Sequence, residues 1–79
     1  MKTHYEYIWF DNTPVNPAAK TTRWACCNNA SGDELGIVKW YGPWRRYCYF
    51  PHGIEIYSAG CLADIQDFIK QLMDARRSA

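Results

Sequence analysis

The feature that most constrains the fold is a regular spacing of apolar residues in the last third of the chain. Apolar and amphipathic side chains recur there at steps of three and four, which places them along one side of an α-helix. This pattern predicts a helix over residues 59–76, with Ser58 as its N-cap. Such a helix needs an apolar surface to cover, and the rest of the chain must supply it. The stripe comprises Cys61, Leu62, Ile65, Phe68, Ile69, Leu72 and Arg76.

The rest of the chain has the pattern of β-strands separated by turn-forming residues. We expect strands at 3–10, 21–27, 35–41 and 45–50, and a fifth, short edge strand at 54–57 is the open alternative. Residues 11–20, which contain Pro14 and Pro17, are expected to form an irregular, mobile connection. The prediction is one small α+β domain over residues 1–79. Its antiparallel sheet of four to five strands carries one C-terminal amphipathic helix on one face.

The aromatic content is high for so short a chain. Four Trp, six Tyr and three Phe occur in 79 residues, and each can bury roughly 150–250 Å². A domain near the lower size limit for a stable core cannot enclose all of them. Some are therefore expected at the surface, in a ligand site or at the interface of a homo-oligomer.

Charge and hydropathy limit the classes of function. A net charge of +1 excludes a strongly basic protein that coats DNA. Basic residues outnumber acidic ones between residues 20 and 52, so we expect any basic face to come from the middle of the chain. No apolar run approaches the ~20 residues of a membrane span, and the first residues lack the pattern of a signal peptide. We expect a cytoplasmic protein with reduced cysteines and no membrane contact.

The hairpin of residues 35–51 holds the densest group of aromatic and basic residues. Because side chains alternate between the two faces of a strand, the group divides into two sets, although a slip of one residue in register would exchange them. The set predicted to face the helix is Val38, Trp40, Cys48 and Phe50. The set predicted to face outward is Lys39, Tyr41, Arg45, Tyr47 and Tyr49. Trp44 and Arg46 lie next to the turn and can serve either face.

An outward face of rings and cations suggests binding. Aromatic rings stack on bases, and Arg or Lys pairs with phosphate. The leading hypothesis is recognition of a phosphate-bearing ligand, either a nucleotide signal or a nucleic acid. The alternatives are an inhibitor that docks the same face on a host enzyme or defence complex, a homodimer interface, and rings that only stabilise the sheet. The candidate ligand-binding residues are Lys39, Tyr41, Trp44, Arg45, Arg46, Tyr47 and Tyr49.

Catalytic and metal-binding motifs are weak in this chain. The sequence has no nucleophile elbow, zinc-protease motif, P-loop or dinucleotide fingerprint, so we expect a protein without enzymatic activity or cofactor. Cys48 and His52 are spaced for a nucleophilic pair, and Cys61 would add a third ligand to a zinc site. The other interpretation is that these cysteines are small apolar residues, the usual role of buried free cysteine.

One longer pattern resembles a known group of proteins. The hairpin sequence LGxVKWYxxWRRYxYFP is followed about ten residues later by a helix that opens CLxxIxxFI. This combination resembles small, mostly uncharacterised proteins encoded by bacteriophages and related mobile elements. The resemblance implies a phage-type accessory protein that acts by binding in the cytoplasm of a bacterial host. It assigns no role to any residue.

Overall fold

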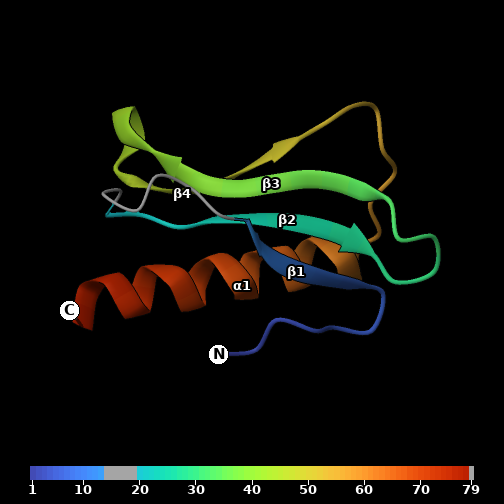
Figure 1. The fold of residues 1–79 in the computed structure, drawn as a ribbon, viewed down its shortest axis with the longest axis horizontal. Coiled ribbons are helices and arrows are strands. Elements are labelled where there is room, and N and C mark those ends of the chain that lie inside the picture. Colours follow the sequence, from blue (N-terminus) through green and yellow to red (C-terminus); the bar gives the residue numbers. More distant parts are fainter. Residues whose placement is uncertain (14–19, 79) are drawn as a thin grey trace.

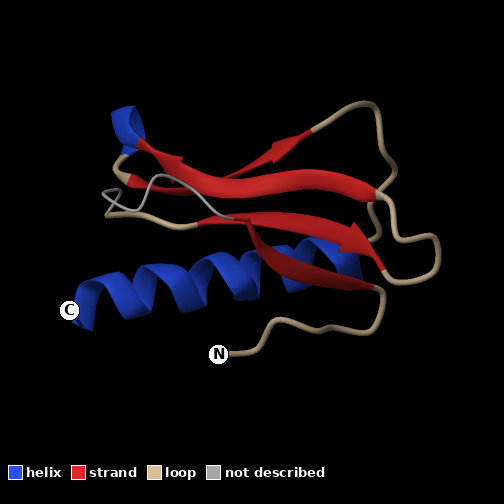
Figure 2. Cartoon of the chain, viewed as in Figure 1, coloured by secondary structure: helices blue, strands red, loops and turns tan. Residues whose placement is uncertain are grey.

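The protein forms a four-stranded antiparallel sheet with one long helix across it. A computed structural model describes residues 1–13 and 20–78. In sheet order the strands are β1 (Ile8–Thr13), β2 (Arg23–Asn28), β3 (Glu34–Tyr41) and β4 (Arg46–Pro51). Helix α1 (Ala59–Ser78) lies against one face of this sheet (Figure 1), and the strands form the second layer (Figure 2). The predicted α+β fold is confirmed.

The first strand begins later than the sequence predicts. Residues 3–5 turn back on β1 instead of continuing it, since the Phe10 N–H donates to the Thr3 carbonyl (2.8 Å) and the Tyr5 N–H to the Ile8 carbonyl (2.9 Å). The side chain of Tyr5 explains the reversal, because its hydroxyl donates to Asp67 of α1 at 2.8 Å. The prediction of a strand at 3–10 is therefore wrong at its start.

The connections also differ from the prediction. Residues 11–13, assigned to the irregular connection, instead extend β1 and pair with β2. Residues 14–19, the rest of that expected mobile connection, lie outside the described residues. Residues 54–57 pair with no strand, because they leave the sheet to reach the start of α1. There the Ser58 hydroxyl accepts the Cys61 N–H at 3.1 Å, so Ser58 caps the helix as predicted.

The core lies between α1 and the sheet. Phe68 is fully buried and stacks face to face on Phe10, with ring centroids 3.9 Å apart. Trp24 meets the same ring edge-on at 5.2 Å. Because Phe68 thus contacts both β1 and β2, it joins the helix to the sheet. The buried core residues are Ile8, Phe10, Cys26, Val38, Tyr47, Ile65, Phe68 and Leu72.

The turn between β3 and β4 sets the register of the hairpin. Gly42–Trp44 form a short 3₁₀ turn, and Arg45 follows in the left-handed conformation (φ 52°, ψ 50°), its N–H donating to the Gly42 carbonyl at 3.1 Å. This four-residue connection pairs Tyr41 with Arg46, and so Val38 with Tyr49 and Lys39 with Cys48. Directly paired residues share a face of the sheet. The turn therefore decides which half of β4 faces the helix.

The stability of this small core should depend strongly on Phe68. We predict that Phe68→Ala lowers the free energy of unfolding by about 3–5 kcal/mol, because it removes a fully buried ring and leaves a cavity. Denaturant unfolding followed by circular dichroism measures the change. Leu62→Ala, at a helix position that is 53% exposed, is the control and should cost far less. Equal losses for both variants would contradict the central role of Phe68.

Candidate functional site

The structure reverses the predicted facing of β4. Tyr49 pairs with Val38 and Tyr47 with Trp40, and all four belong to, or pack against, the core beneath α1. Cys48 and Phe50 pair with Lys39 and Ile37 on the opposite face. The prediction that Cys48 and Phe50 lie in the core while Tyr47 and Tyr49 point outward is therefore wrong. The connection between β3 and β4 has four residues, Gly42–Arg45, so Tyr41 pairs with Arg46. A connection with one residue fewer would have placed Cys48 and Phe50 on the face of Val38.

Tyr47 is a structural residue at the centre of the hairpin. Its side chain is buried, with 6% exposed, and its ring meets Trp40 edge-on at 5.4 Å. Its hydroxyl accepts the Thr22 N–H at 3.1 Å. A ring enclosed in this way cannot stack on a base, so Tyr47 supports the surface without forming it.

Tyr49 holds the segment after β4 against the sheet. Its hydroxyl lies 2.6 Å from the Tyr57 hydroxyl, and the latter also donates to the Leu35 carbonyl at 3.4 Å. Burial raises the pKa of Tyr49 above its ordinary value, and the hydrogen bond with Tyr57 raises it further by a smaller amount. The hydroxyl pair anchors residue 57 and leaves residues 53–56 projecting from the fold.

The other five predicted site residues lie at the surface around the β3–β4 turn. Tyr41 lies between two rings, edge-on to Trp44 at 5.1 Å and 6.0 Å from Phe50. The Lys39 ammonium lies over the Phe50 ring at 4.7 Å. Trp44 is 65% exposed, and Arg45 and Arg46 beside it are also exposed. This cluster combines rings with cations, and it includes Phe50, which was predicted to lie in the core.

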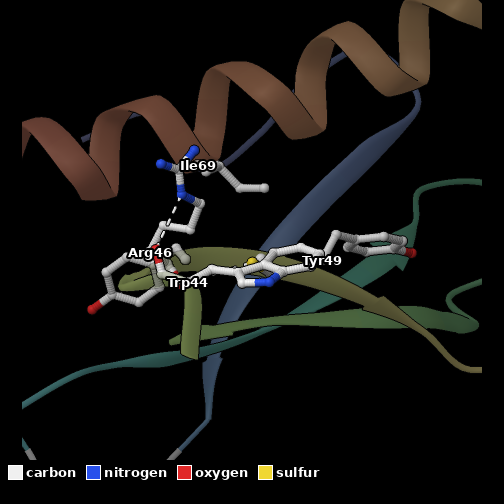
Figure 3. A pocket seen from close by; sticks show the side chains of 6 residues that line it. Trp44, Arg46, Tyr49 and Ile69 are labelled. Carbon is white, nitrogen blue, oxygen red and sulfur yellow. Dashed lines mark hydrogen bonds between the residues drawn. The ribbon is translucent and has the colours of Figure 1, made fainter. Parts of the chain in front are cut away.

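A shallow hollow of about 600 Å³ lies between β4 and α1. Figure 3 shows the Arg46 side chain extending from β4 toward Ile69 of α1, with Trp44 and Tyr49 along the same hollow. The Arg46 Nε donates to the Trp44 carbonyl at 3.4 Å. The guanidinium is thus held beside an exposed indole ring. The lining residues are Trp44, Arg46, Tyr47, Cys48, Tyr49 and Ile69.

Cations from the last turns of α1 extend this surface. Arg46, Lys70 and Arg77 line a second hollow with Asp74. Lys70 donates to Asp74 at 2.9 Å, and this hydrogen bond lowers the pKa of Asp74. On another side, Lys20 and Arg76 line a third hollow beside Tyr47, and the Arg76 guanidinium lies 4.1 Å from the Trp40 ring centroid. Cations therefore flank the end of α1 in two hollows.

Charge is separated along the long axis of the molecule. The start of β2, the β3–β4 turn and the C-terminal end of α1 all lie at one end (Figure 1). We call this the basic end, and it comprises Lys20, Arg23, Arg45, Arg46, Lys70, Arg76 and Arg77. The opposite end, the acidic end, has no Lys or Arg among the described residues. It comprises Glu6, Asp33, Glu34 and Glu55.

The sequence prediction missed part of this surface. Residues 20–52 do contribute Lys20, Arg45 and Arg46, but Lys70, Arg76 and Arg77 come from a segment whose acidic residues balance them in the sequence. Tertiary structure separates these charges, because the helix ends beside the β3–β4 turn. The pair Arg76-Arg77 at the end of the predicted helix is visible in the sequence. It indicates a basic surface only when the direction of the helix across the sheet is known.

The described residues contain neither a cluster of metal ligands nor a helix that could span a membrane. Within residues 1–13 and 20–78, no group of three or more His, Cys, Asp or Glu side chains is placed to hold a metal ion. Cys48, His52 and Cys61 thus do not form the three-ligand set considered from their spacing. In the same part of the chain, no helix is long and apolar enough to cross a membrane.

Comparison with known proteins identifies one family. The chain is 33% identical over 72 residues to the uncharacterised 9.3 kDa protein of Acholeplasma phage L2, and the match covers 91% of each chain. The chain belongs to the family of this phage protein. No model of a protein family matches the sequence, and no solved structure matches it. Membership of the 9.3 kDa phage protein family agrees with the predicted resemblance at the level of small phage-encoded proteins.

The cysteines should differ sharply in reactivity. Burial raises the pKa of the Cys26 thiol to about 12, and burial with the nearby charges of Glu34 and Asp11 raises that of Cys27. We predict that iodoacetamide at about pH 8 modifies the half-buried Cys48 and Cys61 first, because the thiolate is the reactive form. Peptide mass spectrometry over time measures this order. Similar modification rates at all four cysteines of the folded protein would contradict this order. The control is the protein unfolded in denaturant, where all four rates should be similar.

Proposed function

We propose that this protein binds single-stranded nucleic acid at its basic end, without catalysis. The separation of charge carries the proposal. Seven cations gather at one end of a chain whose net charge is only +1, and a single acidic residue, Asp74, lines a hollow with them. Positive potential concentrated on one surface attracts phosphate backbones and orients their approach.

The arrangement of the cations favours a polymer over a single phosphate. Arg46, Lys70 and Arg77 line one hollow, and Lys20 and Arg76 line another. Tyr47 and the end of α1 separate the two groups. The two groups line separate hollows, so a strand that passes over the helix end would meet both. Contacts to several successive phosphates are the usual source of affinity for single strands.

Trp44 supplies the ring that such a site needs. It is 65% exposed, and Tyr41 supports it edge-on at 5.1 Å. A base stacked on this ring would place its phosphate within reach of Arg45 or Arg46. Tyr47 and Tyr49 position the hairpin from the core side, while Lys39 and Tyr41 extend the surface. The phage relationship sets the proposed context, an accessory protein acting in the cytoplasm of a bacterial host.

The proposal predicts a salt-dependent affinity that depends on the basic end. A fluorescently labelled oligonucleotide of about 12 deoxythymidines spans one site of this kind, and its anisotropy reports binding. The logarithm of the affinity should fall linearly with the logarithm of salt concentration, and Arg77→Gln should reduce the slope by about 0.7. The matched control is Ala30→Asp, which lowers net charge equally near the acidic end and should leave the slope unchanged. Absent or salt-independent binding would contradict the proposal.

Trp44 should contribute through stacking and not through charge. We predict that Trp44→Ala weakens oligonucleotide affinity about 5- to 150-fold, the range expected for loss of one stacked base, with no change in the salt slope. Tyr7→Ala is the control, since this ring is also exposed (57%) but lies on the turn before β1, at the other end. Equal effects of the two substitutions would rule out Trp44 as the stacking ring.

A further inference from the structure

The outer edge of β4 has unused hydrogen-bonding groups. In the sheet order, no strand of the described chain lies beyond β4. The His52 N–H points inward to the Leu35 carbonyl (3.0 Å), whereas the Tyr47 N–H points outward and meets only the Met73 sulfur at 3.4 Å. Thioether sulfur is a weak acceptor. By alternation, the backbone groups of Tyr49 also point outward, so this edge can accept another strand.

The opposite edge of the sheet is different. At β1, the N-terminal residues fold back on the strand, and the Phe10 N–H donates to the Thr3 carbonyl at 2.8 Å. The Lys2 N–H in turn donates to Gln71 of α1 at 2.8 Å, which holds the covering segment in place. The fold covers the β1 edge with a backbone segment, whereas the β4 edge meets side chains of α1 but no strand of the described chain.

Large apolar side chains project at both ends of the open strand. Trp44, before β4, is 65% exposed, and Ile54 and Ile56, after it, are 104% and 99% exposed. These isoleucines cannot turn into the core, because the segment is anchored on both sides. His52 pairs with Glu34 on one side, and the Tyr57 hydroxyl bonds Tyr49 on the other. These exposed apolar side chains, held at the two ends of one strand edge, are available for contact with a partner.

Charges of opposite sign also lie at the two ends of β4. Arg45 and Arg46 stand at its start, while Glu34 and Glu55 lie near its end. When two identical strands pair antiparallel, the start of each lies beside the end of the other. In such a pair the basic start of β4 meets the acidic end of its partner.

We infer that two copies of this chain pair through their β4 edges about a two-fold axis near Tyr49. Trp44 precedes β4 and Ile54 follows it, so antiparallel pairing brings the turn of each copy to the side where residue 54 of the other copy lies. The same operation brings Arg45 toward Glu55 of the second copy. Backbone edge, apolar side chains and charges are all complementary under one symmetry operation, which is the property of an isologous interface.

A second copy explains all three features together. A different protein would have to supply a free strand edge, an apolar contact at each end and the reversed charges independently. The inference does not depend on nucleic-acid binding and can be tested on the protein alone; the dimer and a bound strand would compete for Trp44 and Arg45. In the dimer, the sheet continues across the two copies and the two basic ends lie at opposite ends of the assembly.

The test is the concentration dependence of mass in sedimentation equilibrium. The average mass should rise from 9.2 kDa toward twice that value as the chain concentration approaches roughly 1 mM. Ile54→Lys should weaken dimerisation at least about tenfold, since it removes an apolar contact and adds charge near Arg45. Leu62→Lys, at an exposed site on α1, should not. A monomer at every concentration, or equal effects of the two variants, overturns the inference.

A charge exchange tests the antiparallel arrangement directly. Arg45→Glu and Glu55→Arg should each weaken the dimer, and the double variant should restore it. Because these residues stand at opposite ends of β4 within one chain, rescue requires contact between two chains. Failure of rescue in variants with native circular dichroism overturns this arrangement. Hydrogen exchange supplies a second readout, since the Tyr49 amide should gain protection as the concentration rises, and unchanged exchange also refutes the pairing.

Discussion

The structure depends on the contact between Phe68 of α1 and the rings of the sheet. Few side chains of the described residues are fully buried, and Phe68 is the largest of them. It stacks on Phe10 and meets Trp24 edge-on, so one ring ties the helix to two strands. Burying such a side chain contributes about 1.5–3 kcal/mol, a substantial share of the roughly 5–15 kcal/mol that stabilise a typical domain. Contacts farther along α1, from Asp67 to Tyr5 and from Arg76 to Trp40, align the helix along the sheet and so fix the direction in which it runs.

That direction determines where the charges lie. An antiparallel sheet returns the chain to the same end at the start of β2 and at the β3–β4 turn, and α1 finishes there as well (Figure 1). Arg23, Arg45 and Arg76 therefore converge from three parts of the sequence. The acidic residues of the turns before β1 and after β2 collect at the far end. A nearly neutral composition thus gives an uneven distribution of charge, and the topology of the fold produces it.

The sequence predicted the parts of this fold that follow from local pattern. The period of α1, its Ser58 cap and the antiparallel sheet are local features, and the structure confirms them. The facing of β4 is not local, because it depends on whether the turn has an odd or even number of residues. Arg45 in a left-handed conformation makes that number even, and Tyr47 and Tyr49 enter the core with their hydroxyls bonded to Thr22 and Tyr57. Tyrosine can serve either face, so composition could not decide between them.

The separation of charge also has a kinetic consequence. A molecule with most of its cations at one end and carboxylates at the other carries an electric dipole, and its long axis measures 33 Å. In the field of a polyanion this dipole experiences a torque that turns the basic end forward before contact. Such orientation raises the fraction of collisions that are productive, and the gain declines as salt shortens the range of the field to about 8 Å at physiological ionic strength. The polarity built by the fold would therefore influence how quickly this small protein finds a charged target, as well as how tightly it holds it.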